Sequence, residues 1–162
     1  MMPVGRAGED NRQLFLVKAP DLELRLDLRV ASRHFVCFLA CDASGIADSV
    51  ISAAARNLLE AGAVYFCVWG PECERVHDLI DQVVREQLPD EDDQTVIMTT
   101  WHERESLDDA LWFSVFTASA ADAYADSCRA LVAIVVANGN WTSHVKARLE
   151  DPSRFNAEVL TK

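Results

Sequence analysis

The sequence predicts an α/β fold: a single three-layer, doubly wound domain of the flavodoxin or Rossmann type, with a mainly parallel sheet and an N-terminal β extension. Two observations lead to this prediction. After residue 34, short runs that are apolar on both faces recur four times, as in strands covered by helices on both sides. Stretches with helical periodicity separate these runs, and their length suits right-handed crossovers rather than hairpins.

Length and composition set the domain organisation. A chain of 162 residues, half of them hydrophobic, buries a substantial core as one domain. We expect this single α/β domain to span 14–150. The expected divisions are a flexible N-terminus at 1–13, a β extension at 14–30, four βα units at 34–150 and a C-terminal tail at 151–162.

The β extension contains two strand-like pieces. Residues 14–17 are apolar, and the Ala19-Pro20-Asp21 stretch after them suits a turn. In 22–30, leucines alternate with charged residues, which is the period of a strand with one wet face. We expect a hairpin or a pair of edge strands here, and a second copy of the chain pairing along this edge would give a homodimer.

The first two βα units follow in order. The run "HFVCFLAC" from His34 predicts a buried strand, and apolar residues at helical spacing predict a helix from about Ser44 to Gly62. The run "AVYFCVW" predicts the second strand. The helix after it is expected to carry Pro71 in its first turn and to end before Pro89.

The third and fourth units repeat this pattern. "TVIMTTW" predicts a strand, and Ser106 with Asp109 resembles a capping box before an apolar helix at 107–116. The alanine-rich residues 118–129 predict a short helix or a loop. "ALVAIVVAN" predicts the fourth strand and 141–149 the last helix, whereas the tail from Asp151 is weakly patterned and is expected to be partly mobile.

The carboxyl ends of the predicted strands indicate where a site would lie. In open parallel sheets, ligands bind beyond these ends, at the point where strand order reverses. The residues that follow the four strands therefore belong to one rim. The candidate ligand-binding residues on it are Asp42, Trp69, Trp101, His102 and Asn138.

Two of these strand ends carry a resemblance to a known family. "VYFCVWGPEC" and "TVIMTTWHERESLDDALWF" resemble the two signature stretches of an uncharacterised bacterial domain family, a domain of unknown function. Its members have a Trp-Gly-Pro-x-Cys motif after one strand and a Val-Met-Thr-Thr-Trp-His motif after the next. The resemblance covers roughly residues 60–115, with Ile97 in place of the valine. It implies that the rim is a feature of the family and implies no reaction.

Catalytic candidates on the rim are Cys73, His102 and Glu103. A thiol near a helix N-terminus gains thiolate character, and His102 would serve as its base. The carboxylates that flank Cys73 oppose the thiolate, however. Alternatively, His102 paired with Asp42 or Glu103 would act as a general acid–base. In the plain structural interpretation, Cys73 packs under a turn and the carboxylates favour helix N-termini.

Metal and cofactor binding are not expected. Neither a zinc-type spacing nor a phosphate-binding glycine motif occurs in the sequence. A metal site would have to be assembled from dispersed residues, and one of them, His77, is expected on the wet face of its helix. The dispersed candidates are Asp42, Cys73, His77, His102 and Glu103.

Charge and cysteine content bear on partners and location. The formal net charge is −11, which opposes binding to nucleic acid or an anionic membrane and favours a basic protein partner. The five cysteines are odd in number and mostly lie in apolar runs, which is typical of a reducing compartment. The N-terminus lacks the apolar core of a signal peptide, so we expect a cytoplasmic protein.

Three functions remain open from the sequence. The first is a non-catalytic module that binds a ligand or a protein at the rim, and it is preferred because no catalytic set of residues is complete. The second is a small enzyme with a Cys73/His102 or a His102/carboxylate centre. The third is an acidic inhibitor or immunity-type protein that binds a basic partner.

Overall fold

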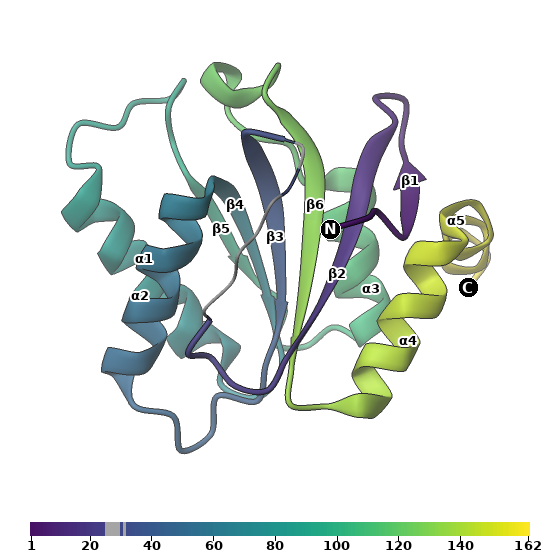
Figure 1. Cartoon of the computed structure of the whole chain (residues 1–162), viewed down its shortest axis with the longest axis horizontal. Coiled ribbons are helices and arrows are strands. Elements are labelled where there is room, and N and C mark those ends of the chain that lie inside the picture. Colours follow the sequence, from purple (N-terminus) through teal and green to yellow (C-terminus); the bar gives the residue numbers. More distant parts are fainter. Residues whose placement is uncertain (25–29, 31) are drawn as a thin grey trace.

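The computed structural model describes residues 1–24, 30 and 32–162. Its strands form one sheet in the order β1-β2-β6-β3-β4-β5 (Figure 1). All neighbouring strands run parallel except β1 and β2, which are antiparallel. The strands are β1 (Gly5–Ala7), β2 (Arg12–Ala19), β3 (His34–Ala40), β4 (Ala63–Trp69), β5 (Met98–Trp101) and β6 (Cys128–Val136).

Helices cover both faces of this sheet, so the predicted three-layer α/β fold is confirmed (Figure 1). One face carries α1 (Asp48–Ala61) and α2 (Cys73–Gln87). The other carries α3 (Leu107–Trp112), α4 (Gly139–Glu150) and α5 (Pro152–Leu160). Within the described ranges, no helix is long and apolar enough to cross a membrane.

Strand β6 occupies the interior of the sheet and pairs with β3 on one side and β2 on the other. Residues 130–135 of this strand are fully buried. Their continuous apolar sequence follows from that position, because helices cover both faces and no side chain can reach water. Strands β3, β4 and β5 follow one another outward, so the order reverses between β3 and β6.

The starts of two helices differ from the sequence predictions. Helix α1 begins at Asp48 rather than near Ser44, because the Asp42 carboxylate accepts a hydrogen bond from the Ser44 N–H (3.0 Å) and favours a turn there. In α2, Glu72 is the N-cap and Cys73 is the first helical residue. Pro71 therefore precedes the helix instead of lying in its first turn.

The second half of the chain contains three further differences. The strand predicted at 95–101 forms only over Met98–Trp101, as β5. Ser106 caps α3 as predicted, accepting a hydrogen bond from the Asp109 N–H (3.1 Å), but the α-helix ends at Trp112 and continues as a π-helical turn, Phe113–Thr117. The residues from Asp151, expected to be weakly structured, form α5. The Asp151 carboxylate caps this helix and Phe155 is buried beneath it.

The N-terminal extension consists of the antiparallel pair β1 and β2. Residues 14–17 lie within β2, which is an interior strand because β6 pairs with its other side. The alternating strand predicted at 22–30 does not form in its described part, 22–24, although the side chains of Leu22 and Leu24 are buried. Its remaining positions 25–29 lie outside the described residues, and the homodimer along it stays a prediction.

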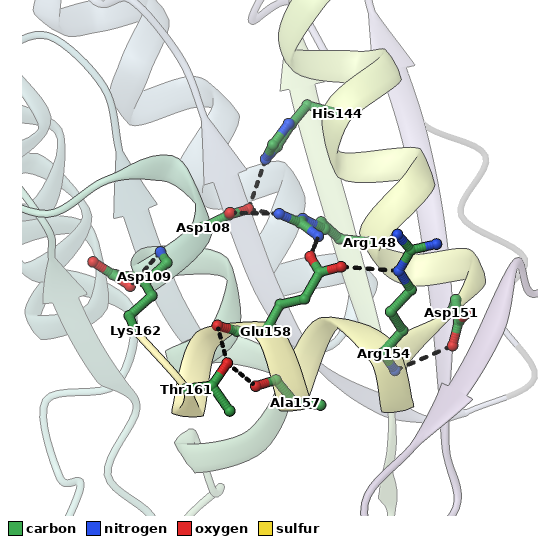
Figure 2. Close-up of polar contacts among 10 residues, drawn as sticks. All are labelled: Asp108, Asp109, His144, Arg148, Asp151, Arg154, Ala157, Glu158, Thr161 and Lys162. Carbon is green, nitrogen blue, oxygen red and sulfur yellow. Dashed lines mark hydrogen bonds and ion pairs between the residues drawn. The ribbon is translucent and has the colours of Figure 1, made fainter.

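A network of charged side chains fastens α5 to α3 and α4 (Figure 2). Arg148 of α4 donates two hydrogen bonds to the Asp108 carboxylate, at 3.0 and 2.8 Å, and a third to Glu158 of α5. His144 also contacts Asp108 (2.6 Å between Nε2 and Oδ1). Because Arg148 holds carboxylates from two helices at once, the order of α5 depends on it.

The Asp108 carboxylate gives this network a pH dependence. Burial acts to raise the pKa of Asp108, but the hydrogen bonds from Arg148 and His144 outweigh it and hold the pKa below its usual value. A carboxylate with a lowered pKa stabilises the fold above its unfolded-state pKa. This contribution is lost as the pH falls through the folded-state pKa.

We therefore expect Asp108→Asn to lower the free energy of unfolding by about 2 kcal/mol at pH 7, the usual loss for charge-assisted hydrogen bonds. The difference from the wild type should shrink as the pH falls below about 4. Urea denaturation at pH 7 and pH 3 measures both effects. Asp109→Asn is the matched control, because among the described residues the Asp109 carboxylate makes only a 3.5 Å contact, with Lys162. A deficit that is unchanged at pH 3 would contradict the proposed ionisation.

Gly70 is required where the chain leaves β4 beside the end of β3. Its φ is 122°, and a Cβ there would lie 2.1 Å from the Cys41 carbonyl oxygen. Gly45 also has a positive φ of 75°, but a Cβ there meets nothing within 4 Å.

We expect Gly45→Ala to lower the free energy of unfolding by about 1 kcal/mol from backbone strain alone. Gly70→Ala should lower the free energy of unfolding clearly more, because its Cβ would also meet the Cys41 carbonyl oxygen. Chemical denaturation measures both variants, and equal losses would show that this close approach is unimportant.

Candidate functional site

The carboxyl ends of the parallel strands form two separate regions of the predicted rim. Asp42 follows β3 and Asn138 follows β6, and these two strands are neighbours. Trp101 ends β5 and His102 follows it, two strands away from β3 in the sheet order. At the usual strand spacing that offset is about 10 Å. The structure therefore places the candidate residues in two groups rather than in one pocket.

A cavity of about 430 Å³ lies where the strand order reverses, and we call it the β3–β6 cavity. Its volume falls within the range of about 300–1,000 Å³ typical of small-molecule sites. Asp42 and Asn138 line it, as do residues that follow β2. The described residues that line it are Pro20, Asp21, Leu22, Glu23, Asp42, Ile46, Val50, Val136, Ala137, Asn138 and Trp141.

The β6 side of the cavity has an unusual backbone. Ala137 adopts a left-handed conformation with a φ of 51°, and its N–H donates to the Ala19 carbonyl oxygen of β2 (2.8 Å). Such a conformation costs about 1–2 kcal/mol for a residue with a Cβ. Asn138 then caps α4 by accepting from the Trp141 N–H (2.9 Å). Together these contacts hold the Trp141 backbone at the cavity wall.

Arg75 of α2 fixes the opposite wall, which is the loop between β3 and α1. Its guanidinium donates to the carbonyl oxygens of Ala43 (2.7 Å) and Ile46 (3.1 Å). It also bonds the carboxylates of Asp48 (2.7 Å) and Glu72 (3.0 Å). Lysine could not reproduce this planar set of donors. Arg75 therefore positions the loop that carries Asp42 and Ile46.

The charges of the lining are acidic. Among the described residues of the lining, Asp21, Glu23 and Asp42 supply carboxylates, and none is a lysine, arginine or histidine. Hydrogen bonds from Ser44 hold the pKa of Asp42 below its usual value, so this exposed carboxylate is ionised at neutral pH. Ile46, Val50 and Trp141 supply apolar surface beside them. This combination suits a ligand with an apolar body and a positive charge.

Trp69 lies behind the cavity wall rather than in it. Its indole N–H donates to the Glu105 carbonyl oxygen (2.9 Å), and its ring meets the Trp141 ring edge to face, with centroids 4.9 Å apart. Both features fix the ring in place. Trp69 therefore supports Trp141, which is the tryptophan that faces the cavity.

His102 is buried, with 4% of its surface exposed, and both of its ring nitrogens have partners. Nδ1 lies 2.8 Å from the Glu105 carboxylate, and Nε2 lies 3.0 Å from the Thr100 hydroxyl. The ring also packs against Phe113, with centroids 5.0 Å apart. The carboxylate partner of His102 is thus Glu105, rather than Asp42 or Glu103. No ring nitrogen is left to face a substrate.

Cys73 is fully buried at the first position of α2. Burial raises the pKa of its thiol, and the nearby Glu103 carboxylate raises it further, while backbone N–H groups offset the rise only in part. A buried thiol with a raised pKa is a poor nucleophile. The ring nitrogens of His102 are already engaged, so the structure gives no support to a Cys73/His102 pair.

Trp101 is 43% exposed at the end of β5, and its ring stacks on that of His77 (centroids 4.4 Å apart). The prediction that His77 lies on the wet face of α2 is wrong, because it is only 9% exposed. Its Nδ1 lies 2.9 Å from the Asp78 carboxylate. Glu103 is exposed. In the described part of the chain, no three His, Cys, Asp or Glu side chains are grouped as metal ligands.

Comparison with known proteins identifies the family. Residues 19–152 match the family described as Domain of unknown function (DUF7684). The chain belongs to this family. No curated protein and no solved structure matches the chain. The DUF7684 match extends well beyond residues 60–115, where the resemblance was noted, and it includes the whole lining of the β3–β6 cavity.

Several important residues of this DUF7684 chain were not predicted from its sequence. Asp21 was assigned to a turn and Glu23 to a strand, and Arg75 had no motif to mark it. Trp141 had a usable signal, because it follows the helix cap Asn138 by three residues and so must lie at the same strand end. Glu105 likewise lies three residues from His102, a spacing that could have indicated the pair.

The contacts of His102 predict a structural role. We expect His102→Ala to lower the free energy of unfolding by about 1–3 kcal/mol, because two hydrogen bonds and the packing against Phe113 are lost. Glu103→Ala, at the exposed neighbouring position, should change it by less than about 0.5 kcal/mol. Denaturant unfolding of both variants measures this. A His102→Ala protein as stable as the wild type would contradict the structural role.

Proposed function

We propose that this DUF7684 chain is a non-catalytic binding module that takes a small organic cation in the β3–β6 cavity. The observation that carries the proposal is the position of the cavity. It lies beyond the carboxyl ends of β3 and β6, where strand order reverses, and this is where doubly wound α/β domains bind their ligands. The apolar surface from Ile46, Val50 and Trp141 would hold the body of the ligand.

The carboxylates of the lining select the charge of the ligand. Asp42 and the carboxylates from Asp21 and Glu23 would attract a protonated amine, and the overall charge of −11 would steer it toward the protein. Anionic ligands such as phosphates would meet carboxylates on several sides. The ligand we propose is therefore a primary or quaternary amine with a small apolar body.

Binding without chemical change is preferred over catalysis. The catalytic alternatives required a reactive Cys73 or an available His102, and neither group faces the β3–β6 cavity. The described residues of the cavity lining offer carboxylates and one amide but no imidazole, thiol or hydroxyl side chain. The five free cysteines are all buried, which suits the reducing cytoplasm that we propose as its location.

Calorimetry with benzylamine, supported by the intrinsic tryptophan fluorescence, tests this proposal, and benzyl alcohol is the uncharged control. We expect benzylamine to bind and benzyl alcohol to bind at least fivefold more weakly. Asp42→Asn should weaken benzylamine binding by a similar factor. This change removes the charge while keeping the oxygen that accepts from Ser44, so the turn is preserved.

Glu103→Gln is the matched control, because it removes a carboxylate outside the cavity and should leave the benzylamine affinity unchanged. Val50→Trp is expected to fill the cavity and abolish binding of both probes. Equal affinities for the amine and the alcohol, or an Asp42→Asn variant that binds benzylamine as the wild type does, would overturn the proposal.

A further inference from the structure

Strand β5 forms one margin of the sheet and has a free backbone edge. Among the described residues it pairs with β4 alone, from Tyr65↔Met98 to Val68↔Trp101. The His102 N–H donates to the Val68 carbonyl oxygen (3.0 Å), so alternate residues of the strand direct their backbone groups toward β4. The N–H and C=O of Thr99 and Trp101 therefore point away from the sheet. We call this surface the β5 edge.

The β5 edge exposes apolar side chains on a rigid base. Met98 is 39% and Trp101 43% exposed, which places both among the large hydrophobic residues that stay exposed in the described chain. The Trp101 ring is held by its stack on His77. The Thr99 hydroxyl bonds the Asp81 carboxylate of α2. An exposed aromatic ring that is already fixed loses little entropy when a partner binds.

Carboxylates surround this edge. A cavity of about 480 Å³ beside Trp101 is lined by three of them, and Arg104 is the one cation among its described lining residues. On α2, Asp78 and Asp81 lie next to His77 beneath the Trp101 ring. The lining of the cavity is Glu74, Trp101, Glu103, Arg104 and Glu105.

We propose that the β5 edge binds an extended segment of a basic protein as an additional strand. The outward N–H and C=O groups of Thr99 and Trp101 would supply the backbone hydrogen bonds of strand addition. A lysine or arginine of that segment would lie over the Trp101 ring between Glu74 and Glu103, where cation–π attraction and charge-assisted hydrogen bonds act together.

Charge decides between this partner and a second copy of the chain. Two β5 edges facing each other would bring the carboxylates of Glu74, Asp78 and Glu103 against their own counterparts, in a chain of net charge −11. Like charges on an edge strand are a common means of preventing self-association. The same carboxylates leave the edge open to a basic segment.

Titration calorimetry with synthetic peptides tests the proposal on the whole protein. The first probe alternates lysine or arginine with valine over seven residues. A second replaces each basic residue with glutamate. A third keeps the basic sequence but carries an N-methyl group on every backbone amide, so neither of its edges can pair. We expect the first peptide to bind and both others to bind at least tenfold more weakly.

Two protein variants locate the contact. Thr99→Pro removes a backbone N–H that points outward, together with the hydroxyl that bonds Asp81. The backbone pairing with β4 remains, and peptide affinity should fall at least tenfold. Trp101→Ala should lower it at least threefold through loss of the cation–π contact. Asp42→Asn should leave it unchanged, which separates this proposal from that for the β3–β6 cavity. Circular dichroism confirms that each variant is folded.

The outcomes are distinct. Binding of the basic peptide that survives N-methylation would show unspecific charge attraction and would overturn strand addition. Failure of the basic peptide to bind the wild-type protein at low salt would overturn the whole proposal. Sedimentation that shows a dimer in the wild type and a monomer in Thr99→Pro would assign the β5 edge to a second copy instead.

Discussion

The position of β6 between β2 and β3 is the constraint on which the rest of the structure depends. Along the chain, β3, β4 and β5 are added in order toward one margin of the sheet, and β6 then pairs with the other side of β3. The loops after β3 and β6 therefore leave the sheet side by side and lead to helices on opposite faces. A crevice must open between them. The β3–β6 cavity is that crevice, and Arg75, Asn138 and the strained Ala137 hold its walls in place.

The same topology separates the two surfaces to which we assign binding. The cavity lies near the middle of the sheet, whereas the β5 edge lies at one margin. Both are rich in carboxylates, and both combine them with a tryptophan, Trp141 in one and Trp101 in the other. These carboxylates would attract positively charged partners to both surfaces, in addition to the general effect of the net negative charge.

The sequence patterns predicted the strands whose burial determines their composition. They failed to predict the elements and the site that depend on contacts between residues far apart in the sequence. Runs apolar on both faces marked β3, β4 and β6 because burial between helices leaves no polar position. The weak pattern after Asp151 concealed α5, since that helix depends on Arg148 and the burial of Phe155. Likewise, the rim residues were predicted to converge, but strand order separates His102 from Asp42, and strand order has no local signature.

Interstrand nuclear Overhauser effects at Ala133 test the central claim most directly. The register pairs Ala133 with Leu16 of β2 on one side and with Phe38 of β3 on the other. We therefore predict backbone effects from Ala133 to residues of both strands, adjacent to these partners, in the free protein. Nuclear Overhauser effects between β2 and β3, together with effects from Ala133 to only one of these two strands, would contradict the account. They would also remove the basis for the β3–β6 cavity.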